Sequence, residues 1–211
     1  MDIPELLPIQ KSKNEQIKNV KANLIIMLSN RGLIEKKNMK STIDKLINNN
    51  NDMEMEFEIN IDNPENYNTK IPNKKIHVKF FDTKIMSMSK NSLIGNFIAK
   101  YFDEYKILIV ENINPKIELT IHKHKTQTEI FKFTSLITNI IDHYLVPKHI
   151  VLSPEEKKEV KNAYGVLDKN FPLILSNDPI AKYYNMKQND VCKIIRKSKN
   201  SGRAISYRIC V

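Results

Sequence analysis

The sequence predicts an α+β protein of two domains, an N-terminal α/β domain and a small C-terminal α+β module that ends in a β-hairpin. Its 211 residues suit one large domain or two small ones. A strand, helix, strand pattern occupies the middle of the chain, and helix caps followed by two strand patterns occupy its end. Hydrophobic residues are 41% and charged residues 27% of the chain, which is ordinary globular usage and argues against global disorder.

The first two predicted elements are amphipathic helices. Apolar side chains recur at helical spacing over residues 13–30, and Asn-Arg-Gly at 30–32 is a stop signal. Residues 37–48 show the same spacing, and the asparagines at 48–51 end it. We therefore expect two helices before the first strand.

A half-buried strand and a polar loop are predicted next. Apolar side chains alternate with Glu54, Glu56 and Glu58 over residues 53–60, which predicts a strand with one acidic face. Residues 61–74 are polar and contain two prolines, so they are expected to form a loop.

A parallel βαβ unit is predicted in the middle of the chain. Residues 75–81 have a strand pattern, 93–101 a helical pattern and 106–112 an unbroken apolar strand pattern. An unbroken apolar strand is typical of a sheet that is covered on both faces, and a helical connection suits parallel strands. A short helix or strand at 115–122 and a strand at 128–133 are expected to follow.

The C-terminal segment has the clearest local signals. Residues 153–156 form a capping box with proline at the first helical position, and Gly165 is expected to close that helix. Asp178 and Pro179 repeat the signal for a short helix through Tyr183.

A hairpin is predicted at the end of the chain. Strand patterns at 191–197 and 204–211 are joined by a turn in which Asn200-Ser201-Gly202 can adopt positive φ. Alternation along these strands predicts one apolar face and one polar face.

The charge of the chain is concentrated near its C-terminus. The net charge is +10, and residues 144–211 contain 13 basic and 6 acidic side chains. The chain has 30 lysines and only four arginines, of which Arg196, Arg203 and Arg208 lie in the last sixteen residues. Because Arg makes planar, bidentate contacts that Lys cannot, this concentration predicts a specific contact. The alternative is that these arginines bind the module's own strands and loops.

A metal-dependent nuclease is the enzymatic alternative. Asp82 ends one predicted strand, and Glu104-Tyr105-Lys106 begins another, as in nucleases that hold a metal ion with such residues. Asp/Glu-x-Lys occurs six times in this Lys-rich chain, so surface charge is the simpler explanation of the motif.

Other candidate chemical groups are weaker. His122 and His124 alternate without the further ligands that a zinc site needs. Cys192 and Cys210 fit small buried side chains in strands. Four glycines do not provide a Gly-rich phosphate loop, and no stretch has the roughly 20 apolar residues of a membrane helix. We therefore expect no catalytic residue, no metal, no cofactor and no membrane segment.

Three ordered blocks carry a resemblance to a known family. They are LVPKHIVLSPEEKKEV (145–160), ILSNDPIAKYY (174–184) and VCKIIRKSKNSGRAISYRICV (191–211). Together they resemble the C-terminal half of the fifth subunit common to eukaryotic RNA polymerases I, II and III, a half that is similar to a small subunit of archaeal RNA polymerase. MLSNRGLI (27–34) and the strand segments near residues 75 and 106 resemble the N-terminal domain of the eukaryotic subunit.

The resemblance implies a two-domain, non-catalytic polymerase subunit. Residues 1–142 would form a jaw domain that resembles restriction-type nucleases without their active site and projects toward downstream duplex DNA. Residues 143–211 would form an assembly module that docks on the largest polymerase subunit. The chain would not be a homo-oligomer, and its binding to DNA would be weak and non-specific. It would work in a nucleus if cellular, or in host cytoplasm or a virion if viral.

The resemblance also assigns candidate residues for docking. We expect contacts with the largest subunit from Pro147, Lys148, His149, Asp178, Pro179, Arg196, Ser198, Gly202, Arg203, Tyr207 and Arg208. Where the family commonly has glycine, this chain has Asn185 and Asn189, and Asn tolerates left-handed backbone geometry. The segment LVPKH is expected to be a hinge, the first strand of the module, or both.

A free-standing basic nucleic-acid-binding protein is the second alternative. It would bind DNA tightly without a polymerase, whereas the nuclease alternative predicts magnesium-dependent cleavage that Asp82→Ala abolishes. Residues 1–143 contain 21 basic and 18 acidic side chains, and this near balance does not favour tight DNA binding by that part of the chain.

Overall fold

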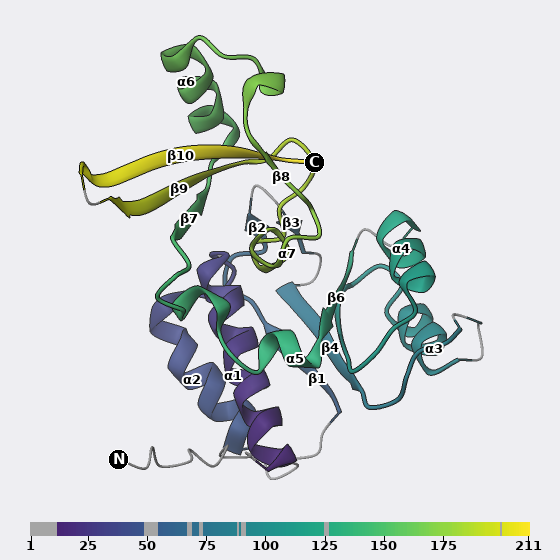
Figure 1. Cartoon of the computed structure of the whole chain (residues 1–211). Helices are drawn as coiled ribbons and strands as arrows, with labels where there is room; N and C mark the ends of the chain where they lie inside the picture. The colour runs from purple at the N-terminus through teal and green to yellow at the C-terminus, as the bar shows by residue number, and fades with distance from the viewer. Residues whose placement is uncertain are drawn as a thin grey trace, which may run out of the picture.

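The computed structural model has a lower α/β part, residues 12–136, and an upper part, residues 148–211, from which a long hairpin projects (Figure 1). The structure describes residues 12–48, 55–66, 69–71, 74–87, 89, 92–124, 127–198 and 200–211.

The order of elements follows the sequence prediction closely. The helices are α1 (Lys13–Asn30), α2 (Lys36–Asn48), α3 (Leu93–Lys100), α4 (Pro115–His124), α5 (Phe133–Leu136), α6 (Pro154–Tyr164) and α7 (Pro179–Tyr183). The strands are β1 (Glu56–Asn60), β2 (Glu65–Asn66), β3 (Thr69–Lys70), β4 (Lys75–Phe81), β5 (Tyr105–Val110), β6 (Thr128–Lys132), β7 (Lys148–Val151), β8 (Leu173–Ile174), β9 (Val191–Ser198) and β10 (Gly202–Cys210). Short 3₁₀ turns occupy Ile140–Asp142 and Asp168–Asn170.

The lower part is built on a mixed sheet with strand order β1-β4-β5-β6. β4 and β5 are parallel, as are β5 and β6, while β1 pairs antiparallel with β4 at one edge. The predicted parallel βαβ unit is therefore confirmed, with α3 as the crossover between β4 and β5.

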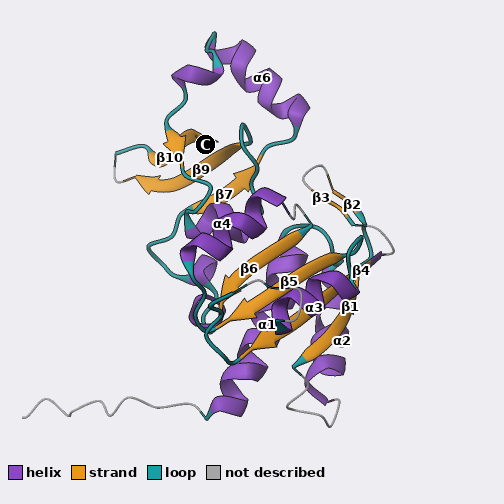
Figure 2. Ribbon diagram, turned by 90° about the vertical axis from the view of Figure 1, so that its right-hand side faces the viewer, coloured by secondary structure: helices purple, strands orange, loops and turns teal. Residues whose placement is uncertain are grey.

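This sheet is covered on both faces, as the apolar run of β5 predicts (Figure 2). Ile107 and Ile109 point into the core shared with α1, α2 and α5. Leu108 and Val110 point into a second core formed with α3 and α4. Because side chains alternate along a strand, a strand that is buried on both faces is apolar along most of its length, and in β5 the exception is Lys106 near its start.

The upper part contains a second sheet with strand order β7-β9-β10-β8. The Ser153 hydroxyl accepts a hydrogen bond from the backbone of Glu156, whose side chain accepts one from the backbone of Ser153, so the predicted capping box is confirmed. Gly165 ends α6 in a left-handed conformation, as predicted. The segment that we expected to be a hinge or a first strand does contribute a strand, since β7 begins at Lys148.

Two asparagines adopt the left-handed geometry that the resemblance implies at their positions. Asn185 has φ 51° and Asn189 has φ 73°. Asn is among the few non-glycine residues that adopt this conformation routinely, so both turns form without glycine.

The structure adds elements that the sequence pattern did not show. The predicted loop at 61–74 contains the two-residue strands β2 and β3. Of the two alternatives expected for 115–122, a short helix or a strand, the structure has the helix α4. The two-residue strand β8 and the four-residue helix α5 are too short to produce a periodic pattern. Residues 53 and 54 of the predicted first strand lie outside the described part of the chain.

The upper and lower parts are packed together through α7. Tyr183 is buried in the core that contains α1, and Tyr184 packs against this core and against the core of the second sheet. The C-terminal end of α7 is therefore in contact with both parts of the molecule.

Candidate partner-binding surface

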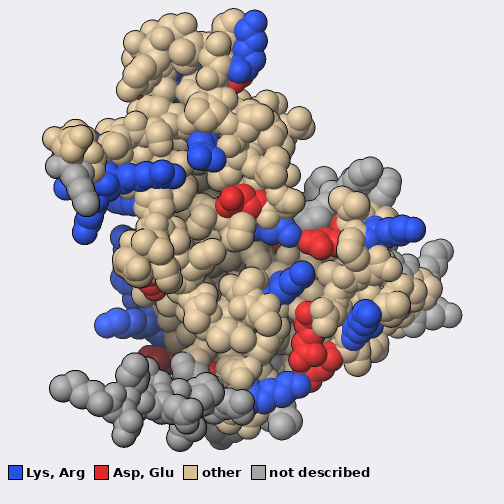
Figure 3. Space-filling model, viewed as in Figure 1, with Lys and Arg blue, Asp and Glu red and all other residues tan. Residues whose placement is uncertain are grey.

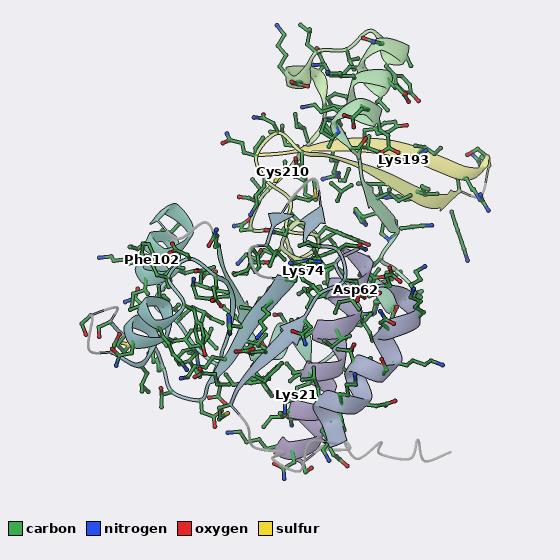
Figure 4. The ribbon with its side chains drawn as sticks, turned by 180° about the vertical axis from the view of Figure 1, so that it is seen from behind. Lys21, Asp62, Lys74, Phe102, Lys193 and Cys210 are labelled. Atoms are coloured by element: carbon green, nitrogen blue, oxygen red, sulfur yellow. The ribbon has the colours of Figure 1, made fainter. Side chains whose placement is uncertain are left out.

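The hairpin of β9 and β10 is the most prominent feature of the upper part (Figure 1). The two strands pair antiparallel from Val191↔Ile209 out to Ser198↔Gly202. Near the base, Val191, Cys192 and Cys210 are buried, while residues 202–206 of β10 are exposed. Cys210 is labelled at this base in Figure 4. The base thus belongs to the core of the module, and the outer half extends into solvent.

Each face of the hairpin carries a basic side chain from each strand. Directly opposed residues share a face, so Lys197 and Arg203 lie together on one face. Arg196 lies opposite Ala204 and shares the other face with Arg208. The three C-terminal arginines therefore do not share one face, because Arg203 lies on the same face as Ile205 and on the opposite face from Arg208.

The outer half of the hairpin has unpaired positive charge. Residues 191–211 contain no Asp or Glu. Within the described chain, Lys193, Arg196, Lys197 and Arg203 form no ion pair. Figure 3 shows Lys and Arg side chains along the projecting hairpin without acidic side chains between them on this face. Such a surface is suited to an acidic partner.

Several predicted contact residues stabilise the module itself. Asp178 caps α7 by accepting a hydrogen bond from the backbone N–H of Ile180 at 2.8 Å, and Pro179 is the first residue of that helix. Arg208 donates to the carbonyl of Leu173 at 3.2 Å. Arg208 therefore binds the module's own backbone, which is the alternative that the sequence analysis gave for the arginines.

Three more predicted residues shape or brace the hairpin. Gly202 has φ 67° at the turn, where a left-handed conformation favours glycine. The Ser198 hydroxyl accepts a hydrogen bond from the backbone of Ser201 at 3.4 Å. Tyr207 packs against Tyr164 of α6, with ring centroids 5.8 Å apart.

His149 of β7 interacts with four other predicted residues, which are Pro147, Asp178, Arg196 and Arg208. His149 is half-buried, and its Nδ1 lies 2.7 Å from the carbonyl of Pro147. Burial lowers the pKa of His149, and the nearby Arg196 and Arg208 lower it further, while the Pro147 carbonyl and Asp178 oppose the shift. The neutral form of His149 is thus favoured. Lys148, the first residue of β7, is exposed.

The sequence reasoning missed the role of Arg31, which lies at the C-terminal end of α1. Its guanidinium is buried and pairs with Glu129 of β6 through two contacts of 2.7 and 2.8 Å. It also donates to the carbonyls of Tyr183 at 2.7 Å and Lys182 at 3.0 Å in α7. Arg31 therefore caps a helix of the upper part from within the lower part.

The buried pair is supported by further polar contacts across the two parts. The hydroxyl of Tyr105 in β5 donates to Glu129 and accepts from Asn185 at 3.0 Å. Burial raises the pKa of Glu129, but the facing Arg31 outweighs this effect and lowers it. Burial lowers the pKa of Arg31, and the Glu129 carboxylate outweighs that effect in turn. Both groups are therefore charged.

Comparison with known proteins identifies the family. The model of the family described as "RNA polymerase Rpb5, C-terminal domain" matches residues 138–210. The DNA-directed RNA polymerase subunit 5 of Acanthamoeba polyphaga mimivirus is 31% identical over 210 residues, which cover 98% of this chain and 97% of the relative. The chain belongs to the Rpb5 family of DNA-directed RNA polymerase subunits.

Cellular relatives agree with this membership. The subunit rpabc1 of DNA-directed RNA polymerases I, II, and III from Dictyostelium discoideum is 36% identical over 152 residues, covering 66% of this Rpb5-family chain and 74% of the relative. The corresponding protein of Caenorhabditis elegans is 41% identical over 87 residues, or 41% of each chain. As a member of the Rpb5 family, the chain is a component of the polymerase and not its catalytic centre.

The geometry of the lower part excludes the nuclease constellation considered from the sequence. Asp82 follows the C-terminal end of β4, whereas Glu104 precedes the N-terminal end of the parallel strand β5. At about 3.3 Å per residue the two carboxylates are separated by roughly 20 Å along the sheet. The Lys106 ammonium group donates to backbone carbonyls, including that of Glu104 at 2.6 Å, and Asp82 pairs with Lys13 at 2.9 Å.

Metal and membrane sites have no candidates in the described part of the chain. Among the described residues, no group of three or more His, Cys, Asp or Glu side chains could hold a metal ion. The side chains of His122 and His124 lie outside the described part of the structure. None of the described helices is both long enough and apolar enough to cross a membrane.

Proposed function

We propose that residues 143–211 of this Rpb5-family subunit are an assembly module that docks on the largest polymerase subunit. The single observation that carries the proposal is the outer half of the hairpin, where Arg196 and Arg203 have no acidic partner among the described residues. A folded chain that leaves such groups unpaired on a projecting element offers them to another molecule. Charge pairs that lose water at an interface cost about 2–5 kcal/mol when one partner is truncated.

We further propose that residues 1–142 form a jaw domain directed toward downstream duplex DNA. Its sheet, covered by helices on both faces, supports the proposed likeness to a restriction-type nuclease fold, and the separation of Asp82 from Glu104 is consistent with loss of such an active site. The near balance of basic and acidic side chains in this part predicts weak, non-specific DNA binding.

The mimivirus and amoeba relatives are compatible with both proposed settings for the subunit. It would act in the nucleus if its source is cellular, and in host cytoplasm or the virion if its source is viral. It would be present as one copy within the polymerase and not as a homo-oligomer.

The experiment is a tagged purification of the full chain from its native source, with co-purifying chains identified by mass. We expect the large polymerase subunits in near-equal amounts. Recovery of the chain alone, resistant to salt, would contradict the proposal and would favour a free-standing nucleic-acid-binding protein. A salt titration on duplex DNA with the full chain then provides the second readout, and we expect binding to be lost by moderate salt.

A further inference from the structure

The two edges of β10 are paired over very different lengths. On one side, β9 pairs with β10 from Gly202 to Ile209. On the other side, β8 pairs only with Ile209 and Cys210. In the described chain, no strand covers residues 202–208 on the β8 side. The outer part of β10 is therefore the edge of a sheet.

Hydrogen bonds at the base establish which groups face this edge. The N–H of Ile209 donates to the carbonyl of Pro172 at 2.9 Å, and the N–H of Val211 donates to the carbonyl of Ile174 at 3.0 Å. Both carbonyls lie on the β8 side of β10. The N–H of Cys210 donates to the backbone carbonyl of Asp190 at 2.8 Å, which lies on the β9 side.

Because these directions alternate along a strand, the remaining outward groups can be assigned. The N–H and C=O of Ile205 and Tyr207 point away from β9, in line with the path of β8. Within the described part of the chain, no other residue forms a hydrogen bond with these groups. An extended segment that continued the path of β8 would find these four groups in register.

The surroundings of this edge suit an apolar and acidic strand. Ile205 is 52% exposed, and Leu173 and Leu175 near β8 are 56% and 59% exposed. Arg203 and Lys197 share a face beside the edge, and Arg196 occupies the other face. The open part of β10 contains no proline, one of the features by which proteins block strand addition.

We propose that an extended segment of the polymerase chain on which the module docks adds to the open edge of β10 as a further strand, with acidic side chains facing the hairpin's cations. This inference rests on the proposed function and specifies its contact. Backbone pairing would supply affinity, and the alternating charges would select the partner segment.

Charge complementarity favours this occupant over a second copy of the chain. Edge-to-edge pairing of two such hairpins would join two segments that each carry only positive charge, because residues 191–211 contain no acidic side chain. Like charges that face each other oppose association.

The test uses two proline substitutions that differ by one residue. Ile205→Pro removes an outward N–H and leaves the bonds to β9 intact, and proline is tolerated in edge strands in that orientation. Ser206→Pro removes an N–H that faces β9. Each full-length variant and Ile205→Val are expressed with a tag in the native source, and the recovery of large polymerase subunits and the melting temperature are measured.

We expect Ile205→Pro to melt near the wild type and to recover at least tenfold less polymerase, while Ile205→Val, which keeps the outward N–H, recovers at least tenfold more than Ile205→Pro. Ser206→Pro should lower the melting temperature. Wild-type recovery by Ile205→Pro would overturn the edge contact but leave the proposed function standing. Failure of the wild type itself to recover polymerase would instead contradict the proposed function.

Hydrogen exchange provides a readout that does not depend on a variant folding. In the free chain the amides of Ile205 and Tyr207 should exchange fast, and that of Ser206 slowly. In the assembled polymerase we expect the first two to become protected at least tenfold. Unchanged fast exchange of both amides in the assembled polymerase would contradict strand addition.

Discussion

Arg31 and Arg203 show two opposite uses of the same side chain. Arg31 is 7% exposed and is bound by the Glu129 carboxylate and by backbone carbonyls of α7. Arg203 is exposed on the projecting hairpin and has no acidic partner in the described structure. The first arginine satisfies its charge within the chain, and the second leaves its charge available to another molecule.

Arg31 stabilises the fold of the subunit, whereas Arg203 is available for contact with another molecule. A buried guanidinium has to be paired, because desolvation of an unpaired charge is costly. An exposed guanidinium remains hydrated, so its removal changes the free energy of unfolding little. The two sites can therefore be distinguished by measuring folding stability and assembly on the same variants.

The largest expected effect is that of Arg31→Ala on stability. Removal of Arg31 leaves the buried Glu129 carboxylate unpaired, so the free energy of unfolding should fall by about 3–5 kcal/mol in urea titrations. The matched control is Arg203→Ala, for which we expect a change within about 0.5 kcal/mol. Equal losses in the two variants would remove the distinction between the two arginines.

A smaller effect is expected for Tyr183→Phe. Its hydroxyl accepts a hydrogen bond from Asn30 at 2.9 Å across the contact between α1 and α7. Loss of this one bond should lower the free energy of unfolding by about 0.5–1.5 kcal/mol. The same change at the exposed Tyr144 should have no measurable effect, since 87% of that residue is exposed. A neutral Tyr183→Phe would show that this hydroxyl adds nothing to the contact.

The smallest effect concerns Glu56, on the acidic face predicted for the first strand. Burial raises its pKa, but hydrogen bonds from Lys100, Lys79 and Tyr101 outweigh this and lower it from 4.5 to about 2. Because the folded pKa is depressed, the stabilisation is present at neutral pH and is lost as pH falls from about 4.5 toward 2.

Glu56→Gln therefore should cost about 1 kcal/mol or less at neutral pH, since the lysines are partly exposed. The difference from the wild type, measured by urea unfolding at several pH values, should shrink as the pH falls below about 4.5. A difference that stays constant down to pH 2 would show that Glu56 acts through packing and not through its charge.

Local signals explain why the sequence predicted the elements of the module so well. The cap at Ser153, the left-handed Gly165 and the cap at Asp178 each depend on residues within a few positions of one another. Such features follow from the backbone and are readable without a tertiary structure.

The contacts between distant segments could not be read in this way. Arg31 and Glu129 are 98 residues apart, and Tyr183 lies a further 54 residues along the chain. One signal for the role of Arg31 was available in the sequence. Outside the last sixteen residues, every basic residue other than histidine is a lysine except Arg31, which follows a predicted helix. Nor could the sequence show that Arg208 binds the Leu173 carbonyl, because β8 is too short to be predicted.

The most direct test of the account is the double variant Arg196→Ala/Arg203→Ala, in which melting temperature and polymerase recovery are measured together. The account predicts an unchanged melting temperature and at least a tenfold loss of co-purifying large subunits, since both side chains are exposed and have no acidic partner within the described chain. A lowered melting temperature with wild-type recovery of polymerase would contradict it, because the arginines would then stabilise only the chain itself.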